Sequence, residues 1–237
     1  MPTATPILFI PGLLCDARLW RDQIEALSPY APCIVADVTQ DDSVAGMAAR
    51  LLAKAPPRFK LIGLSMGGYV AFEVLRQARD RIEALALLDT SAAPDTPARS
   101  AEREAAIQSL QHGRFSGVTD KLLPSLVDPR HLHGPVAQEI KAMAQRVGPD
   151  AFIRQQRAIM TRPDSRPMLG DLDLPALVAV GDGDALTPPM EAITIFRALP
   201  NASFHLFHRC GHLPALEQPE ATSALLLRWV ESLNASA

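Results

Sequence analysis

The sequence has few cysteines, no long apolar run and no large excess of either charge, and each shortage excludes a class of protein. Three cysteines, Cys15, Cys33 and Cys210, are few and odd in number, which is typical of a reducing compartment. The net charge of −3 provides no basic footprint for nucleic acid or an anionic membrane. No apolar run approaches the ~20 residues of a membrane-spanning helix. The N-terminus lacks the basic region and cleavage site of a signal peptide, so we expect a cytoplasmic protein without nucleic-acid or membrane partners.

Short apolar runs alternate with helix-like segments along most of the 237 residues. Six such runs occur, and most of them are apolar on successive residues, as in parallel strands that are covered on both faces. These predicted strands are residues 7–10, 33–38, 59–64, 82–88, 176–180 and 203–207. The predicted helices that follow most of them are residues 19–27, 45–53, 68–77, 189–199 and 220–233. Repeated strand–helix units predict an α/β fold with a doubly wound, mostly parallel six-stranded sheet.

One region breaks this alternation. Residues 95–169 contain no convincing strand, only helix-like segments that glycines and prolines interrupt. Such a segment, inserted after the fourth strand, is typical of a helical cap over one end of a sheet. We therefore expect a core made of residues 1–94 and 170–237 and a cap made of residues 95–169.

The join between the third strand and its helix has an unusual composition. Gly63 and Gly67 flank Ser65 two residues away on each side, although glycine weakens both strands and helices. Gly-x-Ser-x-Gly at a strand-to-helix turn is a nucleophile elbow, in which the glycines leave room for a strained serine. The helix N-terminus then directs its positive dipole end at the reacting centre. Ser65 is therefore the candidate nucleophile.

An elbow serine needs a base and an acid that orients the base. The turn after the fifth predicted strand carries Asp182 and Asp184, and the loop after the sixth carries His208 and His212. Both loops lie at the carboxyl ends of the strands, where open parallel sheets bind their ligands. The chain order serine, acid, histidine is that of this class of elbow.

These motifs together resemble the α/β-hydrolase fold superfamily, and in particular its small capped bacterial members related to carboxylesterases and lactone or enol-lactone hydrolases. The resemblance covers nearly the whole chain through FIPGLLCDARLW, GLSMGGYVAFEVL, LLDTSA, GDGDALTPP and CGHLPALEQPE. Relatives with a full sheet begin with an antiparallel hairpin, for which the six residues before the first strand are too few. The resemblance thus implies six parallel strands, with residues 33–38 at an edge.

The same resemblance assigns the acid and the base. It implies Asp184 as the acid and His212 as the base, and it makes Asp182 a brace for its own loop. Asp89 follows the strand after the elbow, where some relatives keep their acid, and it is the rival to Asp184. His205 and His208 are interpreted as structural or surface residues. His112, His131 and His133 fall in the cap, where we expect solvated side chains, with contact to the substrate as the alternative.

The tetrahedral intermediate needs two backbone donors, an oxyanion hole. One is the N–H of Met66, the residue after the nucleophile, and the other comes from the loop after the first strand. Relatives usually have His-Gly in this loop, whereas this chain has Pro11 followed by Gly12. By position the second donor is the N–H of Leu13, and the absent histidine removes a familiar brace of the loop.

The sequence therefore predicts a metal-free, cofactor-free serine hydrolase that acts on a small carboxylic ester, lactone or thioester through an acyl-enzyme on Ser65. Carbon–carbon bond hydrolysis and cofactor-free perhydrolysis on the same fold remain alternatives. A non-catalytic ligand-binding homologue is a third alternative, although it has no need of the full set Ser65, Asp184 and His212. We expect a monomer or a dimer.

Overall fold

The computed structural model describes residues 4–111, 113 and 115–235, and within them six strands form one sheet. Every neighbouring pair is parallel, in the order β2-β1-β3-β4-β5-β6. The strands are β1 (Ile7–Ile10), β2 (Cys33–Val35), β3 (Phe59–Leu64), β4 (Ile82–Leu88), β5 (Ala176–Gly181) and β6 (Ala202–Phe207). The predicted doubly wound, six-stranded parallel sheet is confirmed, and its second strand lies at an edge.

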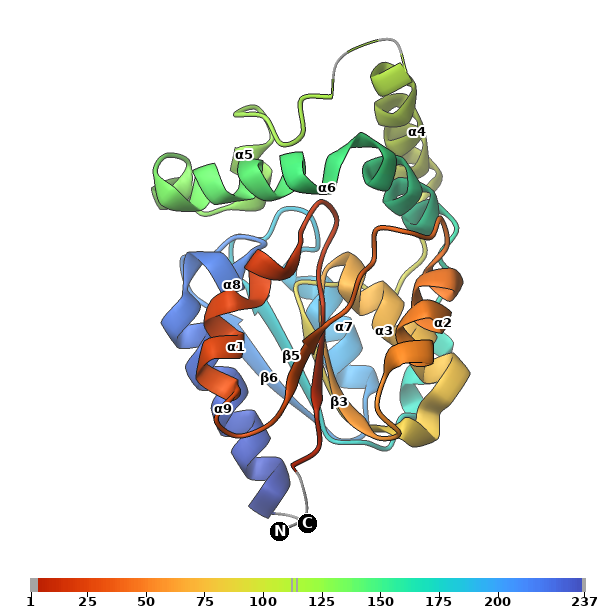
Figure 1. The fold of residues 1–237 in the computed structure, drawn as a ribbon, viewed down its shortest axis with the longest axis vertical. Helices are drawn as coiled ribbons and strands as arrows, with labels where there is room; N and C mark the ends of the chain where they lie inside the picture. Colours follow the sequence, from red (N-terminus) through yellow and green to blue (C-terminus); the bar gives the residue numbers. More distant parts are fainter. Residues whose placement is uncertain (1–3, 112, 114, 236–237) are drawn as a thin grey trace.

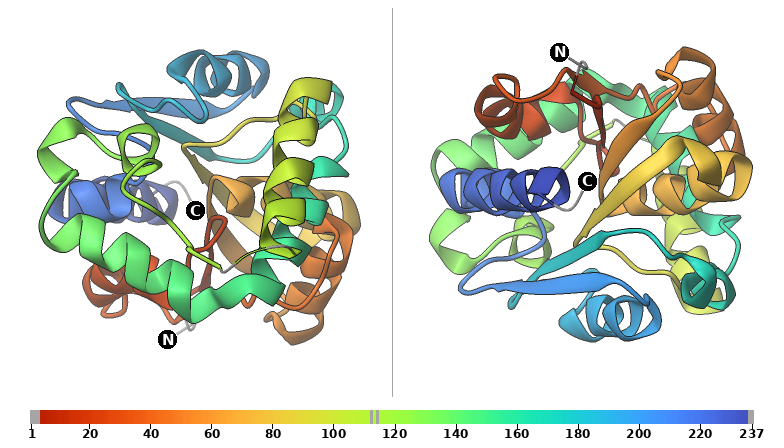
Figure 2. Two further views of the ribbon diagram at one scale, coloured as in Figure 1. Left: turned by 90° about the horizontal axis from the view of Figure 1, so that it is seen from above. Right: turned by 90° about the horizontal axis from the view of Figure 1, so that it is seen from below.

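Helices cover both faces of this sheet (Figures 1 and 2). One face carries α1 (Arg21–Leu27) and α9 (Pro219–Ala235), and the other carries α2 (Val44–Lys54), α3 (Met66–Ala78) and α7 (Pro189–Ala198). Short helical segments are η1 (Ala17–Trp20), η2 (Arg79–Arg81), η3 (Pro129–His131), η4 (Arg166–Asp171) and α8 (Pro214–Glu217). None of the helices in the described ranges is long and apolar enough to cross a membrane.

The central strands are apolar at most positions because both of their faces are covered. In β1, Ile7 and Phe9 pack with α1 and α9, while Leu8 and Ile10 pack with α2 and α3. Successive side chains of a strand point to opposite faces, so each helix layer receives half of them. The continuous apolar runs read from the sequence are the consequence of this double burial.

The edge strand β2 is shorter than the predicted 33–38, because it ends at Val35. The chain turns at Asp37, whose carboxylate accepts hydrogen bonds from the backbone N–H and the hydroxyl of Thr39 at 2.9 and 2.6 Å. An aspartate that bonds the backbone two residues onward forms a local turn that competes with strand pairing. The apolar Val38 lies in the core beyond this turn and made the strand look longer.

Three helices lie between β4 and β5, and the described residues there contain no strand. They are α4 (Pro97–Gln111), α5 (Leu123–Leu126) and α6 (Pro135–Met160), and Figure 1 shows them across the carboxyl ends of the strands. Helix α6 is two helical segments that meet at Gly148, which has a φ of 78° and precedes Pro149. The insert therefore places its helices over the edge of the sheet where the predicted catalytic loops emerge.

Candidate active site

Ser65 occupies a strained turn between β3 and α3. Its φ of 55° and ψ of −116° lie outside the regions that non-glycine residues favour, at a cost of about 1–3 kcal/mol. Neighbouring segments hold this conformation: the Ser65 N–H donates to the carbonyl of Leu88 at 3.0 Å, and the Thr90 hydroxyl donates to the Ser65 carbonyl at 2.7 Å. The strain therefore belongs to the elbow geometry that presents the serine hydroxyl at the end of the sheet.

The two flanking glycines are required by close backbone contacts. A Cβ on Gly63 would lie 2.5 Å from the carbonyl oxygen of Gly67, and one on Gly67 would lie 2.1 Å from the carbonyl oxygen of Ile10. The obstacles are thus the helix turn and strand β1, and not the serine side chain that the sequence suggested. Glycine lets α3 begin directly against β1 and β3, which brings Ser65 next to the loop after β1.

Asp184 and His212 come together on the loops after β5 and β6. The distance from His212 Nδ1 to Asp184 Oδ2 is 2.8 Å, and both side chains are almost completely buried. The Thr187 hydroxyl donates to Asp184 Oδ2 at 2.7 Å, and the N–H groups of Leu186 and Thr187 donate to Oδ1 at 2.8 and 3.0 Å. Burial raises the pKa of Asp184, but the charge and hydrogen bond of His212 and the bonds from Thr187 outweigh it, so the pKa is lowered.

Glu217, which the sequence reasoning missed, organises the histidine loop. Its carboxylate accepts hydrogen bonds from the N–H groups of Gly211 and Leu213 at 3.0 Å each and from that of Asp128 at 2.7 Å. The N–H of His212 itself donates to the carbonyl of Leu126 in α5 at 2.9 Å. A glutamate five residues after His212 was visible in the sequence, but the hydrogen bonds that it accepts cannot be predicted from its spacing.

Asp89, the rival acid, is fully buried at the end of β4 with a φ of 46°. Its Oδ1 accepts from the N–H of Gly181 at 2.9 Å, while its Oδ2 has no hydrogen-bond partner among the residues that the structure describes. Burial, followed by the neighbouring charge of Asp184, raises the pKa of Asp89 well above its usual range. The environment of Asp89 therefore favours its neutral form, whereas the aspartate at 2.8 Å from the His212 ring is Asp184.

The other aspartate and histidine candidates lie elsewhere. Asp182 accepts from the N–H of Cys210 at 3.2 Å and lies 3.4 Å from Nδ1 of the exposed His208, as expected for a loop brace. His205 packs edge-on against Phe207 with ring centroids 4.5 Å apart. Of the histidines in the insert, His112 lies outside the described residues.

The two predicted backbone donors lie in the two segments that adjoin Ser65, the start of α3 and the loop after β1. Met66 is the first residue of α3, and the first N–H groups of a helix have no partner within it. Leu13 lies in the loop after β1, and within the described chain its N–H donates no hydrogen bond. A Cβ on Gly12 would lie 3.4 Å from the Cβ of Ser65, which shows how closely this loop approaches the nucleophile.

A cavity of about 670 Å³ opens onto these groups. Ser65, His212 and Leu13 lie in its wall on the core side. The insert supplies an apolar wall made of Leu110, Phe115, Val118, Leu122, Leu126, Ile140, Phe152 and Ile159. Arg99, Glu102 and Arg103 of α4 form a polar rim. An apolar cavity with a few convergent polar groups is the usual form of a small-molecule site.

Neither a thiol nor a metal fits the site better than the serine. Cys15 also lies in the cavity wall, but burial raises its pKa to about 12, so it is not a thiolate nucleophile. Among the residues that the structure describes, Asp89, Asp184 and His212 bring three possible metal-ligand atoms within 4.8 Å of one another. The Asp184 oxygens already accept bonds from Thr187, Leu186 and His212, so they are occupied as in a hydrogen-bonded acid–histidine pair.

A parallel sheet with a strained serine at a strand-to-helix elbow, and an acid and a histidine on later loops, has the architecture of an α/β hydrolase. The family model of the alpha/beta hydrolase fold matches residues 5–219, and the chain belongs to this family. The resemblance seen in the sequence motifs is thereby confirmed.

Several characterised proteins are similar over nearly their full length. Pimeloyl-(acyl-carrier protein) methyl ester esterase of Neisseria meningitidis serogroup C is 26% identical over an alignment of 250 residues, gaps included. The alignment covers 98% of this chain and 96% of that protein. A thermophilic esterase from Thermogutta terrifontis superposes with a TM-score of 0.88 at 29% identity, covering 98% of this chain and 91% of the other. An enol-lactonase from Burkholderia xenovorans LB400, at 21% identity, TM-score 0.81 and coverages of 97% and 92%, shares the fold.

Proposed function

We propose that this protein is a serine hydrolase that cleaves a small carboxylic ester through an acyl-enzyme on Ser65. The observation that carries the proposal is the buried hydrogen bond of 2.8 Å between His212 and Asp184, together with the position of His212 in the wall of the cavity that Ser65 also lines. The ester-cleaving names of the Neisseria and Thermogutta relatives support the same chemistry.

In the proposed reaction, the Ser65 hydroxyl oxygen bonds to the carbonyl carbon of the ester while Nε2 of His212 takes its proton. The Asp184 carboxylate, bonded to Nδ1, holds the ring in place and favours its charged form. The N–H groups of Leu13 and Met66 donate to the oxyanion. When the intermediate collapses, the alcohol leaves with the proton from His212. Water then adds to the acyl-enzyme with His212 again as base, and the acid is released.

The insert defines which esters fit. We propose that residues 95–169 act as a cap domain on a core of residues 1–94 and 170–237, because their side chains form most of the apolar wall of the cavity. About 670 Å³ accommodates an acyl or alcohol chain of moderate length. The polar rim at Arg99 and Arg103 suits a substrate whose far end is polar.

The proposal is tested with a panel of p-nitrophenyl esters of graded acyl length, matched lactones and acyl thioesters. We expect turnover of the esters, labelling of Ser65 by a fluorophosphonate probe, and an acyl adduct on Ser65 by mass spectrometry during turnover. Ser65→Ala must abolish both labelling and turnover. Lactones or thioesters turned over faster than every ester would change the substrate class. Labelling without turnover of any member would favour carbon–carbon bond hydrolysis, perhydrolysis or a binding role.

A further inference from the structure

The loop that carries the second oxyanion donor leaves β1 in a strained turn. The Cys15 N–H donates to the Gly12 carbonyl at 3.2 Å, which closes a β-turn over residues 12–15. Leu14, the third residue of this turn, has a φ of 57°, in the left-handed region where turns prefer glycine. Rotating the peptide between Leu13 and Leu14 would let Leu14 return to a relaxed conformation. Another part of the molecule must therefore hold this peptide.

Gln155 of α6 holds it. Gln155 is completely buried, its Oε1 accepts from the Leu14 N–H at 3.0 Å, and its Nε2 donates to the Val38 carbonyl at 3.2 Å. A backbone N–H can only donate and a carbonyl can only accept, so the two partners fix the orientation of the side-chain amide. The N–H of the third turn residue takes no part in the turn's own hydrogen bond, which leaves it for Gln155.

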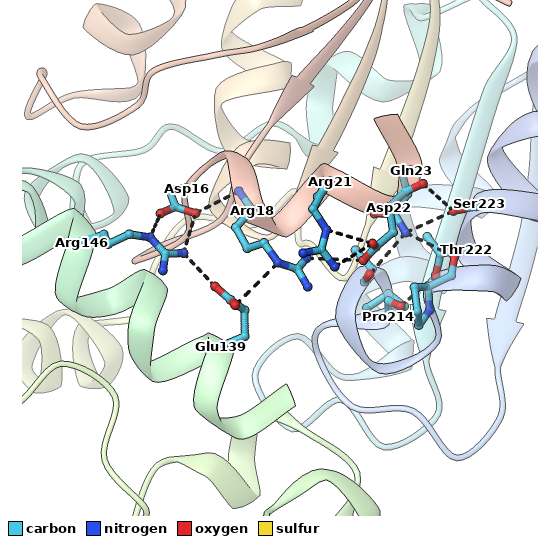
Figure 3. A network of polar contacts seen from close by, with 12 residues as sticks. Asp16, Arg18, Arg21, Asp22, Gln23, Glu139, Arg146, Pro214, Thr222 and Ser223 are labelled. Atoms are coloured by element: carbon cyan, nitrogen blue, oxygen red, sulfur yellow. Dashed lines mark hydrogen bonds and ion pairs between the residues drawn. The ribbon is translucent and has the colours of Figure 1, made fainter. Parts of the chain in front are cut away.

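A second connection between α6 and this region lies at the surface. Figure 3 shows Arg146 pairing with Asp16 at 2.6 Å and with Glu139 at 2.8 Å, while Glu139 lies 3.6 Å from Arg18. About half of the Arg146 side chain is exposed, so solvent and salt screen these pairs. They also reach residues beyond the turn. The buried amide of Gln155 is therefore the contact that fixes the peptide next to the donor.

We propose that Gln155 is a positioning residue: by holding the Leu13–Leu14 peptide in its strained orientation it fixes the turn, and with it the position of Leu13, whose own N–H in the preceding peptide faces the oxyanion. In this chain the cap thus supplies the brace of the loop that lacks the His-Gly of its relatives. The inference rests on the proposed function, because it assigns a role within the same reaction.

The first test compares Gln155→Met with Arg146→Ala. Methionine keeps the volume of glutamine but makes neither hydrogen bond of Gln155. Arg146 is the control because it connects the same helix, α6, to Asp16 at the surface, outside the cavity. With p-nitrophenyl acetate, we expect Gln155→Met to lower kcat about 10- to 100-fold, with KM changed less than about threefold, since an oxyanion contact acts on the transition state. An alkyl trifluoromethyl ketone, which adds the Ser65 hydroxyl to form a tetrahedral oxyanion, should lose affinity by a similar factor. Arg146→Ala should stay within about twofold of the natural protein in both measurements.

A second test uses glycine at position 14, which adopts a positive φ without strain. If Gln155 acts by holding Leu14, then Gln155→Met should cost less than about threefold in kcat when Leu14→Gly is also present. If Gln155 only packs the cap, Gln155→Met should lower kcat by the same factor with and without Leu14→Gly. If Gln155→Met does not fold, Gln155→Asn serves in its place, because the shorter side chain cannot span both backbone partners.

Three results would overturn the inference: a loss confined to KM, an equal loss in Arg146→Ala, or an undiminished loss in the Leu14→Gly background. Failure of the proposed function looks different. If Ser65→Ala retains full turnover, the nucleophile is wrong. If Ser65→Ala is inactive and Gln155→Met has the natural kcat, only the role of Gln155 is wrong.

Discussion

The two sides of the candidate active site are held in place by different parts of the molecule. The acid–base side, which we define as the loops of residues 182–188 and 208–213, is braced mainly by core residues such as Thr187 and Glu217. The oxyanion side, the loop of residues 11–16, is braced at its turn by Gln155 of the insert. The proposed proton-transfer groups are therefore held largely by the core, whereas the turn next to the proposed oxyanion donor is held by the insert.

The largest effect expected is the loss of any member of the proposed triad. Ser65→Ala, His212→Ala and Asp184→Asn should each lower kcat by about 10⁴- to 10⁶-fold, because the three act as a unit. The double variant Ser65→Ala/His212→Ala should be scarcely slower than either single one. Steady-state kinetics together with circular dichroism checks this, and an active Asp184→Asn would break the assignment of the acid–base side to Asp184.

Glu217→Ala should damage the acid–base side through its loop. The change leaves the buried N–H groups of Gly211 and Leu213 without an acceptor, at about 1–3 kcal/mol each. We expect kcat to fall about 100-fold and Tm to fall by about 5–15 °C, measured by kinetics and calorimetry. The control is Glu220→Ala, an exposed glutamate in the first turn of α9, which should leave both values unchanged. An intact kcat in Glu217→Ala would show that the loop does not need this core brace.

A smaller effect is expected where the insert meets the substrate. Phe152→Ala should remove one ring of the Phe115–Phe152 pair, whose centroids lie 6.0 Å apart in the cavity wall. The enlarged cavity should shift the preferred p-nitrophenyl ester by several carbons toward longer acyl chains, with kcat/KM for acetate changed less than about tenfold. An unchanged chain-length profile would show that the insert does not select the substrate.

The smallest effect on turnover is expected for Asp89→Asn. The pKa of Asp89 is higher in the folded than in the unfolded protein. Its contribution to the stability of the folded protein is therefore fully present below the unfolded pKa and is lost as the pH rises toward the folded pKa. The amide cannot ionise, so Asp89→Asn should gain stability relative to the natural protein over that same rise in pH, while kcat changes less than about threefold. Denaturant unfolding at several pH values tests this. A stability difference independent of pH would show that Asp89 is already ionised.

The sequence predicted the sheet well because double burial leaves a local trace. The predicted bounds of five strands agree with the structure within a residue at each end. The bounds of the edge strand β2 are too long, because the turn at Asp37 looks like a continuing strand in the sequence. The elbow was readable from Gly63 and Gly67, whose backbone contacts forbid any side chain. Steric requirements within a few residues are visible in a sequence.

The braces of the site were not readable. Gln155 and Leu14 are 141 residues apart, and nothing in the spacing around a glutamine in an amphipathic helix indicates a backbone partner. The same holds for Glu217, whose contact with Asp128 crosses 89 positions of the chain. Such contacts arise only when the insert lies on the core, so the fold has to be known before they can be found.

Gly148 divides α6 into two helical segments, so the sequence of one segment can change while the position of the other is kept. The first segment carries Ile140 of the cavity wall and the surface pairs of Arg146, and the second carries Gln155. A residue added or removed at the break would rotate the first segment by roughly a third of a turn and leave Gln155 on Leu14. Remodelling the first segment would therefore change the Ile140 side of the cavity and leave Gln155 in place, whereas Phe152 and Ile159 of the cavity wall belong to the segment that holds Leu14.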